Sequence, residues 1–192
     1  MQNSIIAASI AESIAVKQSI LADAGFQQKI EQAAESCIRT FQSGGKVLFC
    51  GNGGSAADAQ HIAAELSGRF YTDRAPLYAE ALHVNSSYVT AVANDYGYDD
   101  VYARMVQAAG RPGDVLVAIS TSGNSPNILK TIDMARRQGM TIIGMTGANG
   151  GKMCDICDIL LNVPSKDTPR IQESHILIGH IICQIIETRV FE

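Results

Sequence analysis

The stretch Lys46-Val-Leu-Phe-Cys-Gly-Asn-Gly-Gly-Ser-Ala-Ala57 joins a short apolar run to a glycine-rich loop and then to the start of a helical pattern. A short apolar run bounded by glycines predicts a buried strand, and Ser55 is a candidate N-cap for the helix that follows. Glycines let backbone N–H groups approach an anion closely, and a helix N-terminus adds positive partial charge. The stretch therefore predicts a strand–loop–helix unit that binds a phosphorylated ligand.

The same alternation of strand and helix continues along the chain. We expect strands at 46–50, 77–84, 114–119, 141–146 and 159–163, and helices at 4–24, 26–43, 55–67, 86–94, 99–109, 126–139 and 169–187. Such alternation predicts a parallel sheet that is covered on both faces. We therefore expect an α/β fold, a three-layer αβα sandwich around a five-stranded parallel sheet. One domain would span residues 1–192, with packing or oligomerisation helices at 1–43 and the α/β core at 44–192.

The composition and charge of the chain argue against several classes of function. A chain that is 46% hydrophobic and 18% charged is globular, and its net charge of -4 argues against nucleic acid or an anionic membrane as partner. We expect no apolar run long enough to span a membrane. Cys154 and Cys157 form a lone C-x-x-C, whereas a zinc knuckle needs a second pair. The remaining cysteines lie in apolar surroundings, so we expect reduced thiols and a cytoplasmic protein.

A second polar loop, Ser120-Thr-Ser-Gly-Asn-Ser125, follows the most apolar of the expected strands. Four of its residues carry hydroxyls, namely Ser120, Thr121, Ser122 and Ser125. Ligands of parallel α/β sheets bind at the carboxyl ends of the strands, where both loops would lie. The pattern favours a phosphate that is bound by hydroxyls and amides without a lysine.

The first loop has alternative interpretations. Gly51-x-Gly53-x-x-Ala56 also fits the dinucleotide pattern, which needs an acidic residue at the end of the next strand. Glu80 falls in the middle of that strand, so a dinucleotide site is disfavoured. No Lys-Ser/Thr pair follows the loop, which excludes a nucleoside-triphosphate P-loop. A tight turn without any ligand remains an alternative.

Histidines and carboxylates supply the candidates for chemistry. His61 and Glu65 are spaced i, i+4 and therefore share a helix face. This spacing suits two ligands of one metal, or a base beside its partner. An ordinary surface pair has the same spacing. Gln172, His175 and His180 interrupt an apolar helical run. Gln172 and His180 would lie about 12 Å apart along the axis, so they share a metal only if it lies between them or if they come from different chains. His180 alone could equally be a core or interface residue.

These features together resemble the SIS (sugar isomerase) domain and, within it, the bacterial sedoheptulose-7-phosphate isomerases, also called phosphoheptose isomerases. The resemblance covers essentially the whole chain and rests on Cys50 to His61, Glu65, Ala93-Asn-Asp-Tyr-Gly97, Ile119 to Ser125, Arg170-Ile-Gln-Glu173 and His180.

The resemblance implies conversion of the ketose sedoheptulose 7-phosphate to the aldose D-glycero-D-manno-heptose 7-phosphate, for lipopolysaccharide or another surface glycan. It implies homotetramers with active sites between subunits, and Glu65 and His180 as catalytic base and acid. It implies one Zn²⁺ per subunit, bound by His61, Glu65, Gln172 and His180. The implied substrate-binding residues are Asn52, Gly53, Gly54, Ser55, Glu65, Asn94, Asp95, Ser120, Thr121, Ser122, Ser125 and Gln172.

Two points qualify the resemblance. Many members of the family have an aspartate where Asn85 stands here, which could alter sugar specificity.

A rival function is that of a non-enzymatic SIS-domain regulator that binds the bacterial replication initiator. Such relatives lose the residues at the positions of Glu65 and His180, and both are present here, which favours the enzyme.

Overall fold

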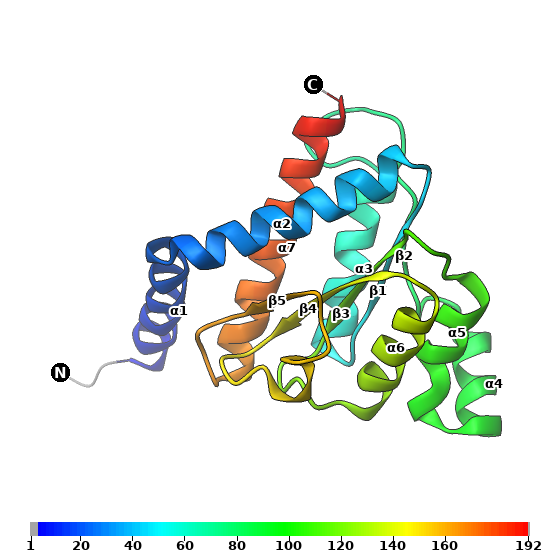
Figure 1. Ribbon diagram of the computed structural model, residues 1–192. Coiled ribbons are helices and arrows are strands. Elements are labelled where there is room, and N and C mark those ends of the chain that lie inside the picture. Colours follow the sequence, from blue (N-terminus) through cyan, green and yellow to red (C-terminus); the bar gives the residue numbers. More distant parts are fainter. Residues whose placement is uncertain (1–3, 192) are drawn as a thin grey trace.

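The computed structural model describes residues 4–191, in which strands and helices alternate (Figure 1). The elements are α1 (Ile5–Ala22), α2 (Ala24–Gln42), β1 (Val47–Cys50), α3 (Gly54–Ser67), β2 (Ala79–Ala81), α4 (Ser86–Tyr96), α5 (Val101–Ala109), β3 (Val115–Ile119), α6 (Pro126–Arg137), β4 (Thr141–Thr146), β5 (Ile159–Asn162) and α7 (Thr168–Phe191). Short 3-10 helices lie at Tyr98–Asp100 and Gly151–Met153.

The five strands form one parallel sheet in the order β2-β1-β3-β4-β5. β1 and β3 are neighbours, with Cys50 paired to Ala118, so the loops that follow these two strands emerge side by side. The strand order also reverses at this point, because β2 lies on one side of β1 and β3 on the other. Ligands of open α/β sheets bind at such a reversal, so the fold places both polar loops where a ligand site is expected.

Helices cover both faces of the sheet, which confirms the three-layer αβα sandwich. Successive residues of a strand point to opposite faces of the sheet, so each strand contributes side chains to both helical layers. In β1, Phe49 belongs to the core shared with α2, α3 and α7, whereas Leu48 belongs to the core shared with α4, α5 and α6. The layer of α2, α3 and α7 bears both His61 and His180.

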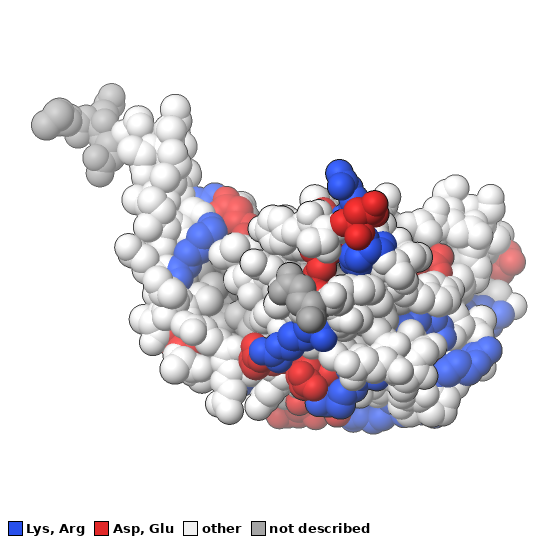
Figure 2. Space-filling model, turned by 90° about the horizontal axis from the view of Figure 1, so that it is seen from above, with Lys and Arg blue, Asp and Glu red and all other residues white. Residues whose placement is uncertain are grey.

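Helix α1 stands apart from the sandwich as a projecting arm (Figures 1 and 2). Ile20 is its one buried residue among those described, and Ile5 is 85% exposed. With 18 residues and a mean hydropathy of 1.5, α1 is long and apolar enough to cross a membrane, so the expectation that no segment reaches that length is wrong for α1. Two charged residues of α1, Glu12 and Lys17, instead lie 3.8 and 4.0 Å from charged partners on α7.

Three expected boundaries are corrected. β2 ends at Ala81 rather than at residue 84, because the backbone turns there and Val84 N–H bonds to Ala81 O. The N-cap of α3 is Gly53, with φ 55°, so the expected N-cap role of Ser55 is wrong; Ser55 lies buried in the first turn. Helix α7 continues past residue 187 to Phe191.

His175 of α7 is a buried neutral histidine. Its Nε2 donates a hydrogen bond to Thr146 O at 3.2 Å, while Nδ1 has no partner among the described residues. Burial lowers the pKa of His175 to about 4. His175 is thus a structural residue, in contrast to His180 on the same helix.

The low pKa of His175 predicts that acid destabilises the fold. Between pH 6.5 and 4 the unfolded chain binds a proton at this position and the folded chain does not, so the free energy of unfolding falls as the pH falls through this window, by about 3 kcal/mol. His175→Gln removes this term, and its unfolding free energy should therefore depend less steeply on pH. Urea denaturation at pH 7 and pH 4.5 measures the difference, and equal slopes for both proteins would contradict it.

Candidate active site

The loop between β1 and α3 is tight and needs its glycines. A Cβ on Gly51 would overlap the backbone of Ser55, and Gly53 has a positive φ that other residues rarely adopt. The hydroxyl of Tyr102 donates to Gly51 O at 2.7 Å, which fixes the loop from the opposite helical layer. The loop therefore brings its backbone to the start of α3 in a tight turn that leaves no room for a Cβ at Gly51.

Asn52 in this loop is held by Asn127, a residue that sequence reasoning missed. The two side-chain amides exchange hydrogen bonds of 2.9 and 2.8 Å, and the Oδ1 of Asn127 also accepts from Ile128 N–H. Asn127 lies just after the second polar loop and is buried. The pair therefore joins the two loops at the carboxyl edge of the sheet.

Three hydroxyl groups of the second loop lie close together. Ser120 Oγ lies 3.0 Å from Ser125 Oγ and 3.5 Å from Ser122 Oγ. Thr121 O accepts from Gly147 N–H, which ties the loop to the end of β4. Beside the loop lies a cavity of about 240 Å³ that is lined by Thr121, Ser122 and Lys166, among others. Lys166 was not anticipated, because it comes from the segment after β5, far away in the sequence.

The other residues expected to contact the sugar lie on α4 and α7. Gln172 lies against Gly54, where an added Cβ would be 2.5 Å from the glutamine Nε2. Asn94 and Asp95 are exposed at the end of α4, where Asn94 donates to Asp95 at 2.9 Å. Asn85 caps α4 by accepting from Tyr88 N–H at 3.0 Å, a structural role that an aspartate would also fill.

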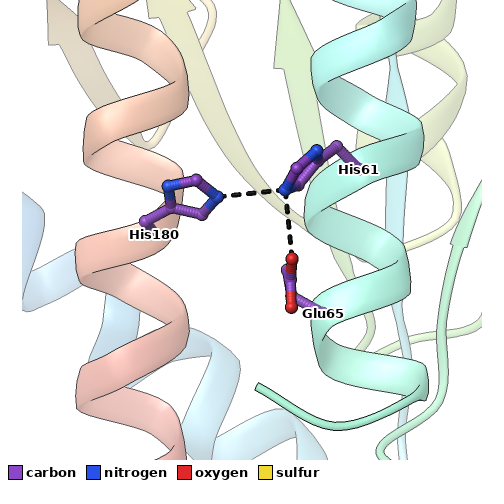
Figure 3. A group of neighbouring side chains, drawn as sticks. All are labelled: His61, Glu65 and His180. Carbon is purple, nitrogen blue, oxygen red and sulfur yellow. Dashed lines mark hydrogen bonds and ion pairs between the residues drawn. The ribbon is translucent and has the colours of Figure 1, made fainter. Parts of the chain in front are cut away.

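His61, Glu65 and His180 form a compact group between α3 and α7 (Figure 3). His61 Nε2 lies 3.0 Å from Glu65 Oε1 and 3.1 Å from His180 Nε2, and one ligand atom from each residue lies within 4.8 Å of the others. His61 is half-exposed, so solvent and small molecules can reach the group. The side chains converge because α3 and α7 run in the same direction, with Gly179 packed on Ile62.

The group fits a divalent metal. His61 Nε2 carries at most one proton, which can form a good hydrogen bond to Glu65 or to His180 but not to both. One cation between the three side chains could accept a lone pair from each of them. Tetrahedral zinc with bond lengths of 2.0–2.1 Å places its ligand atoms about 3.4 Å apart, close to the distances observed here.

The sequence left open whether the residues of this group come from one chain or from several, and the structure answers this for His180. His180 does not have to arrive from another subunit to reach His61, since the same chain brings them together. Gln172 lies near Gly54, seven residues before His61 on α3, so it is about 10 Å along the helix from the group in its own chain. A metal shared by all four residues would need Gln172 from a second chain.

Sequence reasoning also missed the aromatic neighbour of the group. The ring of Phe70 stacks on His180, with centroids 5.7 Å apart and an angle of 24° between the planes. Phe70 follows α3 in a segment without regular structure, and nothing in its spacing from His180 signals the contact.

Proteins of known family are similar to this chain in both sequence and fold. Residues 10–147 match the SIS domain family. The chain is 52% identical over 189 residues to a phosphoheptose isomerase of Aneurinibacillus thermoaerophilus, covering 98% of this chain and 96% of that one. It is 58% identical over 158 residues to one from Rhodospirillum rubrum, covering 82% and 84%. The structure of a phosphoheptose isomerase from Neisseria gonorrhoeae superimposes with a TM-score of 0.91 at 45% identity, covering 98% and 100%.

The Asn52–Asn127 pair predicts a measurable loss of stability on truncation. Asn127→Ala leaves the Asn52 amide and the Ile128 N–H without their buried partner, which should lower the free energy of unfolding by about 1–3 kcal/mol. Urea denaturation measures the change, with Asn149→Ala on the exposed loop after β4 as the matched control. Equal stability of the two variants would show that the pair does not hold the loops.

Proposed function

The chain belongs to the phosphoheptose isomerase family of SIS-domain proteins, and we propose that it converts sedoheptulose 7-phosphate to D-glycero-D-manno-heptose 7-phosphate. It is a sugar-phosphate isomerase that interconverts a ketose and an aldose. The observation that carries the proposal is the group of His61, Glu65 and His180, which puts a carboxylate and two imidazoles on one solvent-accessible spot. Such a set supplies the base and the acid that proton transfer between two carbons requires.

The substrate phosphate would bind at the two polar loops. Backbone N–H groups at the start of α3 and the hydroxyls of Ser55, Ser120, Thr121, Ser122 and Ser125 would donate to its oxygens. Asn52, Gly53, Gly54, Asn94, Asp95 and Gln172 would contact the sugar. What supports this placement is the convergence of both loops at the reversal of strand order.

Glu65 and His180 would exchange protons with C1, C2 and their oxygens. The Glu65 carboxylate removes a proton from C1, the electron pair forms the C1–C2 double bond, and the C2 oxygen takes a proton from His180. The resulting enediol gives its O1 proton back to His180 while C2 receives a proton from Glu65. No net proton is lost, and the carbonyl has moved from C2 to C1.

Zinc fits the same group of side chains. His61, Glu65 and His180 would hold it, with the neutral oxygen of Gln172 from a neighbouring chain as the weakest ligand, one ion for each subunit. When bound, it would act as a Lewis acid that stabilises the negative oxygen of the substrate. His61, which donates no proton in this scheme, would serve only as a ligand.

We infer that each active site is shared between chains. Ser55 and Glu65 are ten residues apart on α3, about 15 Å along its axis, because the helix runs back from the carboxyl edge of the sheet. Six carbon–carbon bonds of about 1.5 Å and a phosphate ester, fully extended, reach only about 10 Å. A phosphate at the loops of one chain would therefore offer its C1 and C2 to Glu65 and His180 of another chain.

The surface supports assembly into a homotetramer. The arm formed by α1 is almost free of charge in the view of Figure 2, and its isoleucines at 5, 6, 10 and 14 are all at least half-exposed. A groove of about 460 Å³ next to α1 is lined by Ile20, Leu21, Ile181 and Ile185, among others. Apolar surface of this extent is typical of an interface.

The product would enter heptose synthesis for lipopolysaccharide or another surface glycan. The reaction would take place in the cytoplasm, because all five cysteines are free thiols and three of them are buried, which suits a reducing compartment.

Removing the proposed base or acid should abolish turnover without loss of the fold. Glu65→Gln keeps the side-chain shape and removes the basicity, and His180→Gln removes the acid; each should lower kcat by about 10²–10⁴-fold. Incorporation of solvent deuterium at the migrating carbon measures the step directly, with product identified by NMR and metal content assayed in parallel. A Glu65→Gln protein that holds metal and exchanges at the wild-type rate would exclude Glu65 as the base.

The metal assignment has its own test. Elemental analysis of purified protein should find about one zinc per chain, and His61→Ala should lose it, because two of three side-chain ligands bind far more weakly than three. A chelator should lower the isomerase rate, and added zinc should restore it. If the protein contains no metal and the chelator leaves the rate unchanged, the ligand assignment fails while the isomerase assignment stands.

The shared site can be tested by mixing two inactive variants. Thr121→Glu places a carboxylate beside the phosphate loop, and Glu65→Gln removes the base. Each should be inactive alone, whereas co-expressed chains should regain activity because some sites combine the intact loop with the intact base. Light scattering should give four times the 20.5 kDa chain mass. A monomeric mass, or mixed chains without activity, would contradict the shared site.

A further inference from the structure

One carboxylate organises the segment that connects α3 to β2. Glu187 of α7 accepts hydrogen bonds from three successive backbone N–H groups, at 3.3 Å from Phe70, 2.9 Å from Tyr71 and 3.0 Å from Thr72. Its fourth donor is the Nε of Arg74, at 3.0 Å. The side chains of Glu187 and Arg74 are only 5% and 4% exposed. A carboxylate buried in this way fixes the path of the backbone that it binds.

Arg74 extends this contact to the end of α3. Its guanidinium donates to the carbonyl oxygens of Glu65 at 2.8 Å, Leu66 at 2.7 Å and Gly68 at 3.0 Å. Carbonyls in the last turn of a helix lack partners within the helix, and a cation at that end is favourable. Arg74 therefore joins the last turn of α3 to Glu187, and thereby to α7.

These contacts connect to the group of His61, Glu65 and His180 at two points. Glu187 is two turns beyond His180, on the same face of α7. One backbone N–H that Glu187 binds belongs to Phe70, whose ring stacks on His180. One carbonyl that Arg74 binds belongs to Glu65 itself. The buried ion pair thus contacts the proposed acid His180 through the Phe70 ring, and the proposed base Glu65 through the Glu65 backbone carbonyl.

We propose that Arg74, Glu187 and Phe70 are positioning residues for the isomerase reaction. The ion pair fixes how closely α3 and α7 approach each other two turns beyond His180, and the Phe70 ring fixes the plane of the His180 imidazole. This inference rests on the proposed function, in which Glu65 and His180 exchange protons with the sugar and bind the metal. Groups that orient metal ligands in this way typically contribute 10- to 100-fold to metal affinity or activity.

A purely structural ion pair is the competing explanation, and the chain contains a suitable control for it. Asp114 is also a buried carboxylate that binds backbone N–H groups, those of Lys46 and Arg111, and one cation, the ammonium of Lys46. It lies at the start of β3, at the opposite edge of the sheet from the two polar loops. Asp114→Asn should therefore lower stability without any effect on the reacting groups.

The experiment compares Glu187→Gln, Phe70→Leu and their double variant with Asp114→Asn and with His180→Gln. The readouts are kcat and KM for sedoheptulose 7-phosphate, the thermal unfolding midpoint, and the visible absorption of bound Co²⁺, which reports ligand geometry. Phe70→Leu leaves the ion pair intact and so remains informative if Glu187→Gln fails to fold. Glu187→Gln and Phe70→Leu should each lower kcat by about 10- to 100-fold with little change in KM, and each should change the Co²⁺ spectrum, whereas Asp114→Asn should leave that spectrum unchanged.

The double variant should lose little more than the worse single variant, because both changes act on His180. Wild-type kcat in Glu187→Gln and Phe70→Leu, or a loss no greater than that of the destabilised Asp114→Asn, would overturn the positioning role alone. Wild-type activity in His180→Gln would instead overturn the proposed role of the group, and the positioning role with it.

Discussion

Helices α3 and α7 touch at Gly179, where the absence of a side chain lets the second helix lie directly on Ile62 of the first. A Cβ at this position would overlap the end of the buried Ile62 side chain, so either that side chain or the helix would have to shift. The next residue, His180, consequently meets His61, which precedes Ile62. Close packing of two parallel helices therefore brings His61, Glu65 and His180 together, and the ion pair of Arg74 and Glu187 joins the same two helices two turns further on.

The two ends of α3 have different tasks. Its first turn lies against the glycine-rich loop and Gln172, at the carboxyl edge of the sheet. Its later turns bear His61 and Glu65. Since a seven-carbon sugar phosphate is shorter than the distance between Ser55 and Glu65, the proposed reaction needs the first end of one chain and the second end of another. The exposed apolar face of α1 and the apolar groove between α1 and α7 would then serve catalysis, because catalysis itself would depend on assembly.

Features that depend on local sequence could be predicted. The strand–loop–helix unit at residues 46–57 and the hydroxyl-rich loop at 120–125 are contiguous, and their place in a parallel sheet follows from strand–helix alternation. Pairing of His61 with Glu65 also follows from spacing on one helix. The edge strand β2 was predicted too long, because its end is set by a turn rather than by apolar residues.

Contacts between distant segments could not be predicted in the same way. Nothing in the spacing shows that His180 meets His61 within one chain while Gln172 meets Gly54, since both follow from the direction of α7 relative to α3. Asn127, Phe70, Arg74 and Glu187 were missed for the same reason. Each is an ordinary residue in its own segment, and its role depends on a partner that only the folded chain brings near.

The most direct test of this account is the isomerase turnover of Gly179→Ala. The added methyl group should separate α3 from α7 and lower kcat by about 10- to 100-fold, while the phosphate loops and KM stay nearly unchanged. Gly179→Ala combined with Ile62→Ala should recover much of the lost rate, because the second change removes the atoms that the new methyl group meets. Wild-type kcat in Gly179→Ala, in folded protein, would show that the approach of these two helices does not build the reacting group.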